Sequence, residues 1–241
     1  MNTLLIKVGE VSDNTLPKFD ALRIGILPYT GSGASRVIDF GANTSVSLTL
    51  NGTGHFTTQD GSEDRGQTIQ NTGRYVFVST DATGYIDITS KQSINVFNSG
   101  SNFSANISEF EYTPATSVIF YSPGLYGSIN DAPLLCSRLE TLVANTDSNF
   151  TGITGDVSNL GNSLRVLQVK NTDLYGNLAD LGKATDLAYL ELQGCTKLLG
   201  TLDDLADALY SNGKVSGTLN AYDVDSTHVV YTFTSEGWTK V

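Results

Sequence analysis

The sequence predicts a mainly β protein in two parts. The first is an all-β module over residues 1–82, and the second is a short repeat solenoid over residues 83–241 with a C-terminal helix and hairpin cap. Aliphatic side chains recur at the same offsets in four stretches whose leading positions, 115, 139, 164 and 187, lie 24, 25 and 23 residues apart. Upstream, short alternating or β-branched runs are separated by Gly, Asn, Asp and Ser clusters, which is typical of strands joined by turns.

The N-terminal module has five candidate strands: Leu4–Val8, Leu22–Leu27, Val37–Phe40, Ser45–Leu50 and Arg74–Ser79. Between the last two strands lies a polar, glycine-dotted segment that contains Asp60, Glu63 and Asp64. The spacing of these carboxylates departs from that of a calcium-binding EF-hand loop, so we expect a solvated, exposed loop tip. Two later segments, residues 84–88 and 93–97, have the character of imperfect early coils.

The four aligned stretches fit the leucine-rich-repeat template L-x-x-L-x-L-x-x-N/C-x-L, with Thr172 and Cys195 in the polar slot of the last two. The expected repeat core consists of Val118, Phe120, Leu139, Leu142, Leu164, Leu167, Val169, Leu187, Leu190 and Leu192. Asp147 takes the polar slot of the second stretch, and Pro123 takes that of the first, which fits the template more loosely. Because side chains alternate along a strand, these residues should point into one core from strands stacked in parallel.

The back half of each unit repeats as glycine, any residue, aliphatic, beginning at Gly127, Gly155, Gly176 and Gly200. After the last of these, Thr201-Leu202-Asp203-Asp204 resembles a capping box, and it predicts a helix over residues 202–210 that Asn212-Gly213 stops. Residues 228–240 predict a closing hairpin. Its tryptophan, Trp238, is expected to plug the cap.

Few residues bear reactive chemistry. Neither His55 nor His228 lies at metal-ligand spacing from a Cys, Glu or His, and no nucleophile or nucleotide motif occurs. Cys136 and Cys195 are expected to be small buried residues of a reducing compartment. Tyr126 and Tyr175 either pack the repeats or form a ligand ladder. We therefore expect that the protein is not an enzyme and that it has no catalytic, cofactor-binding or metal-binding residues.

The chain has a net charge of −11 and a pI near 4.4, with no cluster of Lys or Arg, which opposes binding to nucleic acid or to an anionic membrane surface. The N-terminus lacks a basic region and a cleavage site, so no signal peptide is expected, and no segment is long enough to span a bilayer.

The repeat region resembles short leucine-rich-repeat proteins of phages and prophages of gut bacteria. The resemblance lies in the segments Gly155–Leu160, Leu164–Asn171 and Gly176–Lys183, which are followed by a helix and by an ending in Gly237-Trp238-Thr239. The likeness covers about residues 85–241 and carries no catalytic motif. It implies a virion protein that is assembled in the host cytoplasm, with the β module as anchor and the solenoid displayed outward.

The resemblance leaves the position on the particle open, because the chain could decorate the head or belong to a tail or fibre appendage. The partners that it implies are other capsid or tail proteins and further copies of the chain. An alternative is a host-attachment adhesin that binds a surface glycan or protein through the solenoid. A third hypothesis, from another class, is a depolymerase that cleaves surface polysaccharide with paired carboxylates.

Overall fold

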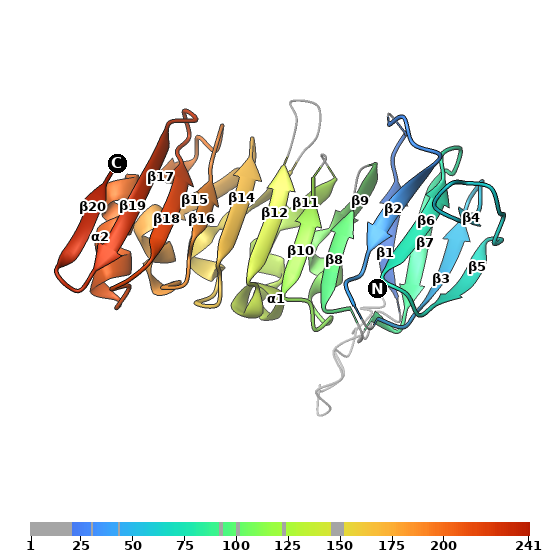
Figure 1. Cartoon of the computed structure of the whole chain (residues 1–241), viewed down its shortest axis with the longest axis horizontal. Helices are drawn as coiled ribbons and strands as arrows, with labels where there is room; N and C mark the ends of the chain where they lie inside the picture. The colour runs from blue at the N-terminus through green and yellow to red at the C-terminus, as the bar shows by residue number, and fades with distance from the viewer. Residues whose placement is uncertain are drawn as a thin grey trace, which may run out of the picture.

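The computed structural model describes residues 21–29, 31–42, 44–91, 94–99, 102–121, 124–145 and 152–241. The protein is mainly β, with 43% strand and 16% helix, and has two large mixed sheets that do not close into a barrel. The sheets run along the long axis of the molecule, with β20 (Gly237–Lys240) near one end and β5 (Thr68–Asn71) at the other (Figure 1). One continuous hydrophobic core lies between them.

The larger sheet has eleven strands. From the C-terminal end its order is β20, β19 (His228–Thr234), β18 (Thr218–Tyr222), β16 (Tyr189–Glu191), β14 (Val166–Lys170), β12 (Thr141–Asn145), β10 (Ser117–Phe120), β8 (Val96–Ser99), β2 (Ser35–Asp39), β6 (Tyr75–Ser79) and β4 (Phe56–Thr57). The nine-stranded sheet has the order β17 (Leu198–Leu199), β15 (Asp173–Asn177), β13 (Ile153–Asp156), β11 (Leu125–Ser128), β9 (Phe103–Asn106), β1 (Leu22–Ile26), β7 (Gly84–Thr89), β3 (Val46–Asn51) and β5.

Strands β8, β10, β12, β14, β16 and β18 pair in parallel, each with the next. In this stack Val118 lies opposite Leu142, Leu142 opposite Leu167, and Leu167 opposite Leu190. The register that the repeat alignment predicts for these strands is therefore confirmed. Pro123 and Asp147, the polar-slot positions of the first two stretches, lie outside the described residues.

The N-terminal strands pair antiparallel instead. The interpretation of residues 84–88 as an early coil is wrong, because β7 pairs antiparallel with both β1 and β3 and completes the N-terminal part of its sheet. The other proposed early coil, residues 93–97, overlaps the start of β8, and this strand begins the parallel stack by pairing with β10. Four predicted strands match β1, β2, β3 and β6, and the fifth, Leu4–Val8, lies outside the described residues.

The polar segment between the last two predicted strands contains two short strands, β4 and β5, that the sequence does not predict. Both sheets continue without a break from the antiparallel strands into the parallel ones, and the hydrophobic core spans the two regions. The two predicted domains therefore share one core, and the division at residue 82 stays a prediction.

In three units a strand of the nine-stranded sheet ends at the Gly-x-aliphatic motif, and a 3-10 helix follows it directly. These helices are η3 (Ile129–Asp131), η4 (Val157–Asn159) and η5 (Leu178–Lys183). The glycine has a positive φ, and the side chain of the next residue caps the helix, as when Asp156 accepts a hydrogen bond from the Ser158 backbone N–H. An earlier unit has a similar helix, η2 (Ile107–Phe110), and α1 (Pro133–Arg138) follows η3.

The C-terminal helix and hairpin are confirmed as separate elements. Helix α2 (Leu202–Ser211) begins at the predicted capping box, in which Thr201 and Asp204 bond to each other's backbone N–H groups. The chain leaves the helix through Asn212 and Gly213, and Gly213 has a φ of +99°. The hairpin consists of β19 and β20, which pair antiparallel.

Candidate functional site

All ten residues of the expected repeat core are at most 1% exposed. They belong to the single core between the two sheets, where they contact other apolar side chains. Their role is to hold the strands together, so a ligand would have to meet other residues.

The two cysteines are free and buried. Cys195 donates to the Val169 backbone oxygen and lies 3.2 Å from the buried Thr172 hydroxyl, so the two polar slots stack on each other inside the protein. Burial raises the pKa of Cys136 to about 12, and burial also raises the pKa of Cys195. Both side chains are protonated thiols at neutral pH, which is the form of an inert structural cysteine.

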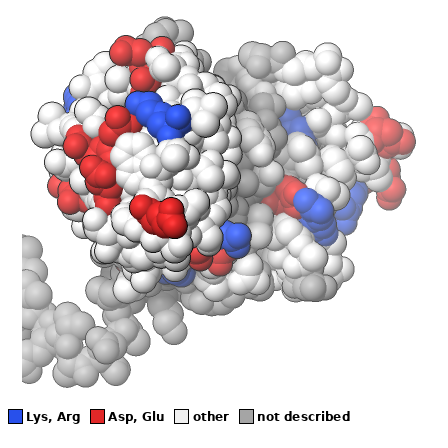
Figure 2. Space-filling model, turned by 60° about the vertical axis from the view of Figure 1, so that its left-hand side comes forward, with Lys and Arg blue, Asp and Glu red and all other residues white. Residues whose placement is uncertain are grey.

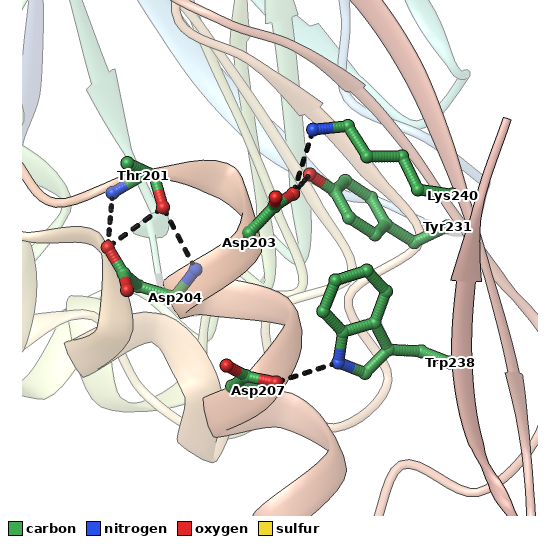
Figure 3. A network of polar contacts seen from close by, with 7 residues as sticks. All are labelled: Thr201, Asp203, Asp204, Asp207, Tyr231, Trp238 and Lys240. Carbon is green, nitrogen blue, oxygen red and sulfur yellow. Dashed lines mark hydrogen bonds and ion pairs between the residues drawn. The ribbon is translucent and has the colours of Figure 1, made fainter.

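Hydrogen bonds join helix α2 to the closing hairpin (Figure 3). Asp203 Oδ1 accepts from the Tyr231 hydroxyl at 2.5 Å and from Lys240 Nζ at 2.9 Å, and Trp238 Nε1 donates to Asp207 at 2.9 Å. The bond from Tyr231 is the main reason that the pKa of Asp203 lies below its usual range. Trp238 is half-buried and meets the Tyr231 ring edge-on at 5.3 Å, so it covers the core together with its neighbours.

A cavity of about 430 Å³ opens between the start of α2 and the β18–β19 turn. Its floor is aliphatic, with Leu178 and Val229 among the lining residues, and its rim carries Asp203, Asp223 and Lys240. Both carboxylates already accept two hydrogen bonds from the protein, since Asp223 Oδ1 holds two backbone N–H groups of its own turn. The polar rim thus mainly stabilises the junction between cap and repeats.

The acidic loop is exposed from Gln59 to Gln67. Hydrogen bonds from Thr58 and Ser62 lower the pKa of Asp60 to about 2, so this carboxylate is stabilised by its own loop. No group of three or more His, Cys, Asp or Glu residues is placed to hold a metal ion within the described ranges. His228 stacks on Tyr222 with ring centroids 4.5 Å apart.

The outer face of the eleven-stranded sheet carries two rows of side chains across β8, β10, β12, β14, β16, β18 and β19. They alternate along each strand with the buried core residues, and most are half-buried. The first row is Val96, Ser117, Thr141, Val166, Tyr189, Asn220 and Val230, and the second is Asn98, Ile119, Val143, Gln168, Glu191, Tyr222 and His228. We call these fourteen residues the neutral strip.

The neutral strip contains one carboxylate, Glu191, which forms a 2.5 Å ion pair with Lys170. The Tyr189 hydroxyl donates to the same carboxylate. The outer face of the nine-stranded sheet carries two carboxylates in the corresponding coils, Asp156 and Asp173, of which Asp173 forms an ion pair with Lys197. Acidic side chains also gather at the C-terminal end of the molecule, which comes forward in Figure 2. A face this low in charge is unusual on a chain of net charge −11 and is the best candidate for a binding surface.

The two tyrosines that the sequence singled out lie elsewhere, on the nine-stranded sheet. Tyr126 and Tyr175 are 39% and 40% exposed, and the Tyr175 hydroxyl accepts a hydrogen bond from Asn130, which lies two coils earlier. The neutral strip is not apparent from the sequence, because its residues occupy the unspecified positions of the repeat template, between the aliphatic ones. The available signal was the lack of Asp, Lys and Arg at those positions.

No helix within the described ranges combines the length and the apolar character that a membrane crossing needs. A comparison of the chain with models of known protein families, with curated proteins and with solved structures finds no match.

Proposed function

We propose that the chain is a non-enzymatic structural protein of a bacteriophage virion, which decorates the head or forms part of a tail or fibre appendage. In this proposal residues 83–241 form a leucine-rich-repeat-like solenoid that is displayed outward, and residues 1–82 form the β module that anchors it. Support for the solenoid comes from the parallel register of β10, β12, β14 and β16, which follows the 23- to 25-residue spacing of the sequence.

The observation that carries the arrangement is the uneven distribution of charge. Residues 1–82 contain six Lys or Arg and eight Asp or Glu, whereas residues 83–241 contain eight and seventeen. When many copies stand side by side, the acidic repeat regions repel one another and the nearly neutral β modules do not. This favours packing through the module, with the repeats pointing away from the particle.

Gold labelling of intact particles with an antibody raised to this chain, viewed by electron microscopy, tests the proposal. Label over the head supports a decoration or head-fibre protein, and label on the tail supports an appendage. Particles without label contradict the virion assignment. We also expect the purified chain to associate with itself, so light scattering from a strict monomer at high concentration would count against the multi-copy arrangement.

The second candidate function is host attachment by an adhesin that binds a surface glycan or protein. The neutral strip favours it, because an exposed face without net charge on an acidic chain is suited to recognising another molecule. The two functions are compatible, since a tail or head appendage can carry an attachment surface.

A further inference from the structure

Five of the seven strands that cross the neutral strip present the same two kinds of side chain. From β8 to β14 and again on β18, one is an aliphatic or aromatic residue and the other is an uncharged hydrogen-bonding residue. The pairs are Val96 with Asn98, Ile119 with Ser117, Val143 with Thr141, Val166 with Gln168, and Tyr222 with Asn220. Strands in a sheet are about 4.8 Å apart, so each of these strands adds one apolar and one polar group at that interval. The two kinds exchange rows between β8 and β10 and between β12 and β14, where Val96 lies opposite Ser117 and Thr141 opposite Val166.

Among the described residues, the side chains of Asn98, Gln168 and Asn220 are in no hydrogen bond or ion pair, and neither are the hydroxyls of Ser117 and Thr141. All five are half-buried, which limits their access to water. A ligand that covered them would have to supply a hydrogen-bond partner on every strand, because a buried polar group without one costs about 1–3 kcal/mol.

The C-terminal end of the strip is different, because it has aromatic rings and a fixed polar group. The ring of Tyr189 lies 6.2 Å from that of Tyr222, which in turn stacks on His228. Beside them Glu191 is held between the Tyr189 hydroxyl and Lys170. This end offers a rigid apolar wall and an oriented carboxylate, while the remainder of the strip offers amides, hydroxyls and aliphatic groups.

We propose that the neutral strip binds an uncharged polysaccharide, with the sugar chain lying across the strands and one sugar unit on about each strand. A pyranose has an apolar C–H face and a rim of hydroxyls that both donate and accept, which matches one apolar and one uncharged polar residue per strand. The proposal rests on the host-attachment function and names its ligand class. Since the strip has no unbalanced charge, an ionic polymer has no counter-charge to bind there.

A second copy of the chain fits the strip less well. Face-to-face packing of two strips would bury their unpaired amides and hydroxyls against each other, in a register that would have to satisfy all of them at once. A hydroxyl-rich polymer adjusts at each unit, and solvated hydroxyls at its outer side need no partner from the protein.

Affinity electrophoresis of the purified full chain tests the proposal, using native gels that contain dextran, mannan, laminarin or, as the charged polymer, alginate. We expect at least one neutral polysaccharide to retard the chain and alginate to leave its mobility unchanged. In that gel Gln168→Ala and Tyr222→Ala should each weaken binding about tenfold, which corresponds to about 1.4 kcal/mol. Tyr175→Ala, an exposed tyrosine on the opposite sheet, is the matched control and should bind like wild type.

Circular dichroism melts establish that each variant is folded. If Tyr222→Ala is destabilised, Asn98→Ala at the other end of the strip provides the same test without the aromatic cluster. Absence of retardation by all three neutral polymers would overturn the proposal, as would equal binding by wild type and strip variants, or retardation by alginate alone. If no neutral polysaccharide binds but gold label is found on the particle, the glycan site is contradicted and the virion function stands. If a neutral polysaccharide binds but the particles carry no label, the glycan site stands and the virion function is contradicted.

Discussion

At the scale of single residues, the repeat core is held by aliphatic side chains stacked from strand to strand. Leu190 is fully buried and pairs with Leu167 on one side and with Ala221 on the other. We expect Leu190→Ala to lower the free energy of unfolding by about 2–5 kcal/mol, because the truncated side chain leaves a cavity that neighbouring strands cannot fill. Urea denaturation measures it. The control is Leu199→Ala, whose side chain is 66% exposed and should change stability by about 0.5 kcal/mol or less.

The glycine of the Gly-x-aliphatic motif makes a different residue-scale contribution. Gly176 has a φ of +105°, and a Cβ placed there would collide with Oδ1 of Asp156, the cap of the preceding unit. The cap of one coil thus occupies the space that the glycine of the next coil leaves open. Gly127 and Gly200 meet the caps Asn106 and Asn177 in the same way.

Gly176→Ala should therefore destabilise the protein more than Gly213→Ala. Both glycines have a similar positive φ, +105° and +99°, so both variants incur the backbone strain of about 1–2 kcal/mol. A Cβ at Gly213 meets nothing within 4 Å, whereas one at Gly176 displaces Asp156 and its hydrogen bond to Ser158. We expect an additional loss of about 1 kcal/mol in chemical denaturation. Equal losses in the two variants would show that the cap contact is unimportant.

At the scale of elements, the cap depends on the hydrogen bonds between α2 and the hairpin. The pKa of Asp203 is lowered in the folded state, so its contribution to stability is fully present above the ordinary carboxyl pKa of about 3.9. It is lost as the pH falls from there through the folded-state pKa. Asp203→Asn should cost about 1 kcal/mol or less at pH 7, since the side chain is 47% exposed, and nothing at pH values below both pKa values.

Urea denaturation of wild type and Asp203→Asn at pH 7 and near pH 2 measures this difference. Asp225→Asn is the control, because it removes the same charge from a carboxylate that forms no hydrogen bond among the described residues. If the difference between wild type and Asp203→Asn persists unchanged in acid, the ionised carboxylate is not the group that joins the helix to the hairpin.

Periodicity made the parallel strands of the larger sheet predictable, because Val118, Leu142, Leu167 and Leu190 mark equivalent core positions. It did not reveal that the back half of each unit forms the second sheet. Strands β13 and β17 have only four and two residues and contain or precede a glycine, so no alternation marks them. The neutral strip was equally hidden, since a surface defined by missing charges becomes visible only when the sheet brings its residues together.

At the scale of the whole molecule, the parallel repeats and the antiparallel module share both sheets. Strand β8 joins them, because it pairs in parallel with β10 and antiparallel with β2. On the other sheet β9 pairs with β11 and β1 in the same two ways. Unfolding either region would therefore expose an edge of the other and the apolar surface beneath it. This coupling favours one cooperative unit over two independent domains.

We expect one coincident unfolding transition by two probes that report on different parts of the chain. Trp238 is the only tryptophan and lies in the C-terminal hairpin, so its fluorescence follows the cap, whereas far-ultraviolet circular dichroism follows the strands of the entire molecule. In urea the two curves should superimpose, because loss of the cap exposes the last coil and the shared core carries the loss to the other end. A fluorescence transition that is complete while the dichroism has changed only in part would mean that the cap and the repeats unfold separately from the module, as weakly coupled repeat arrays do.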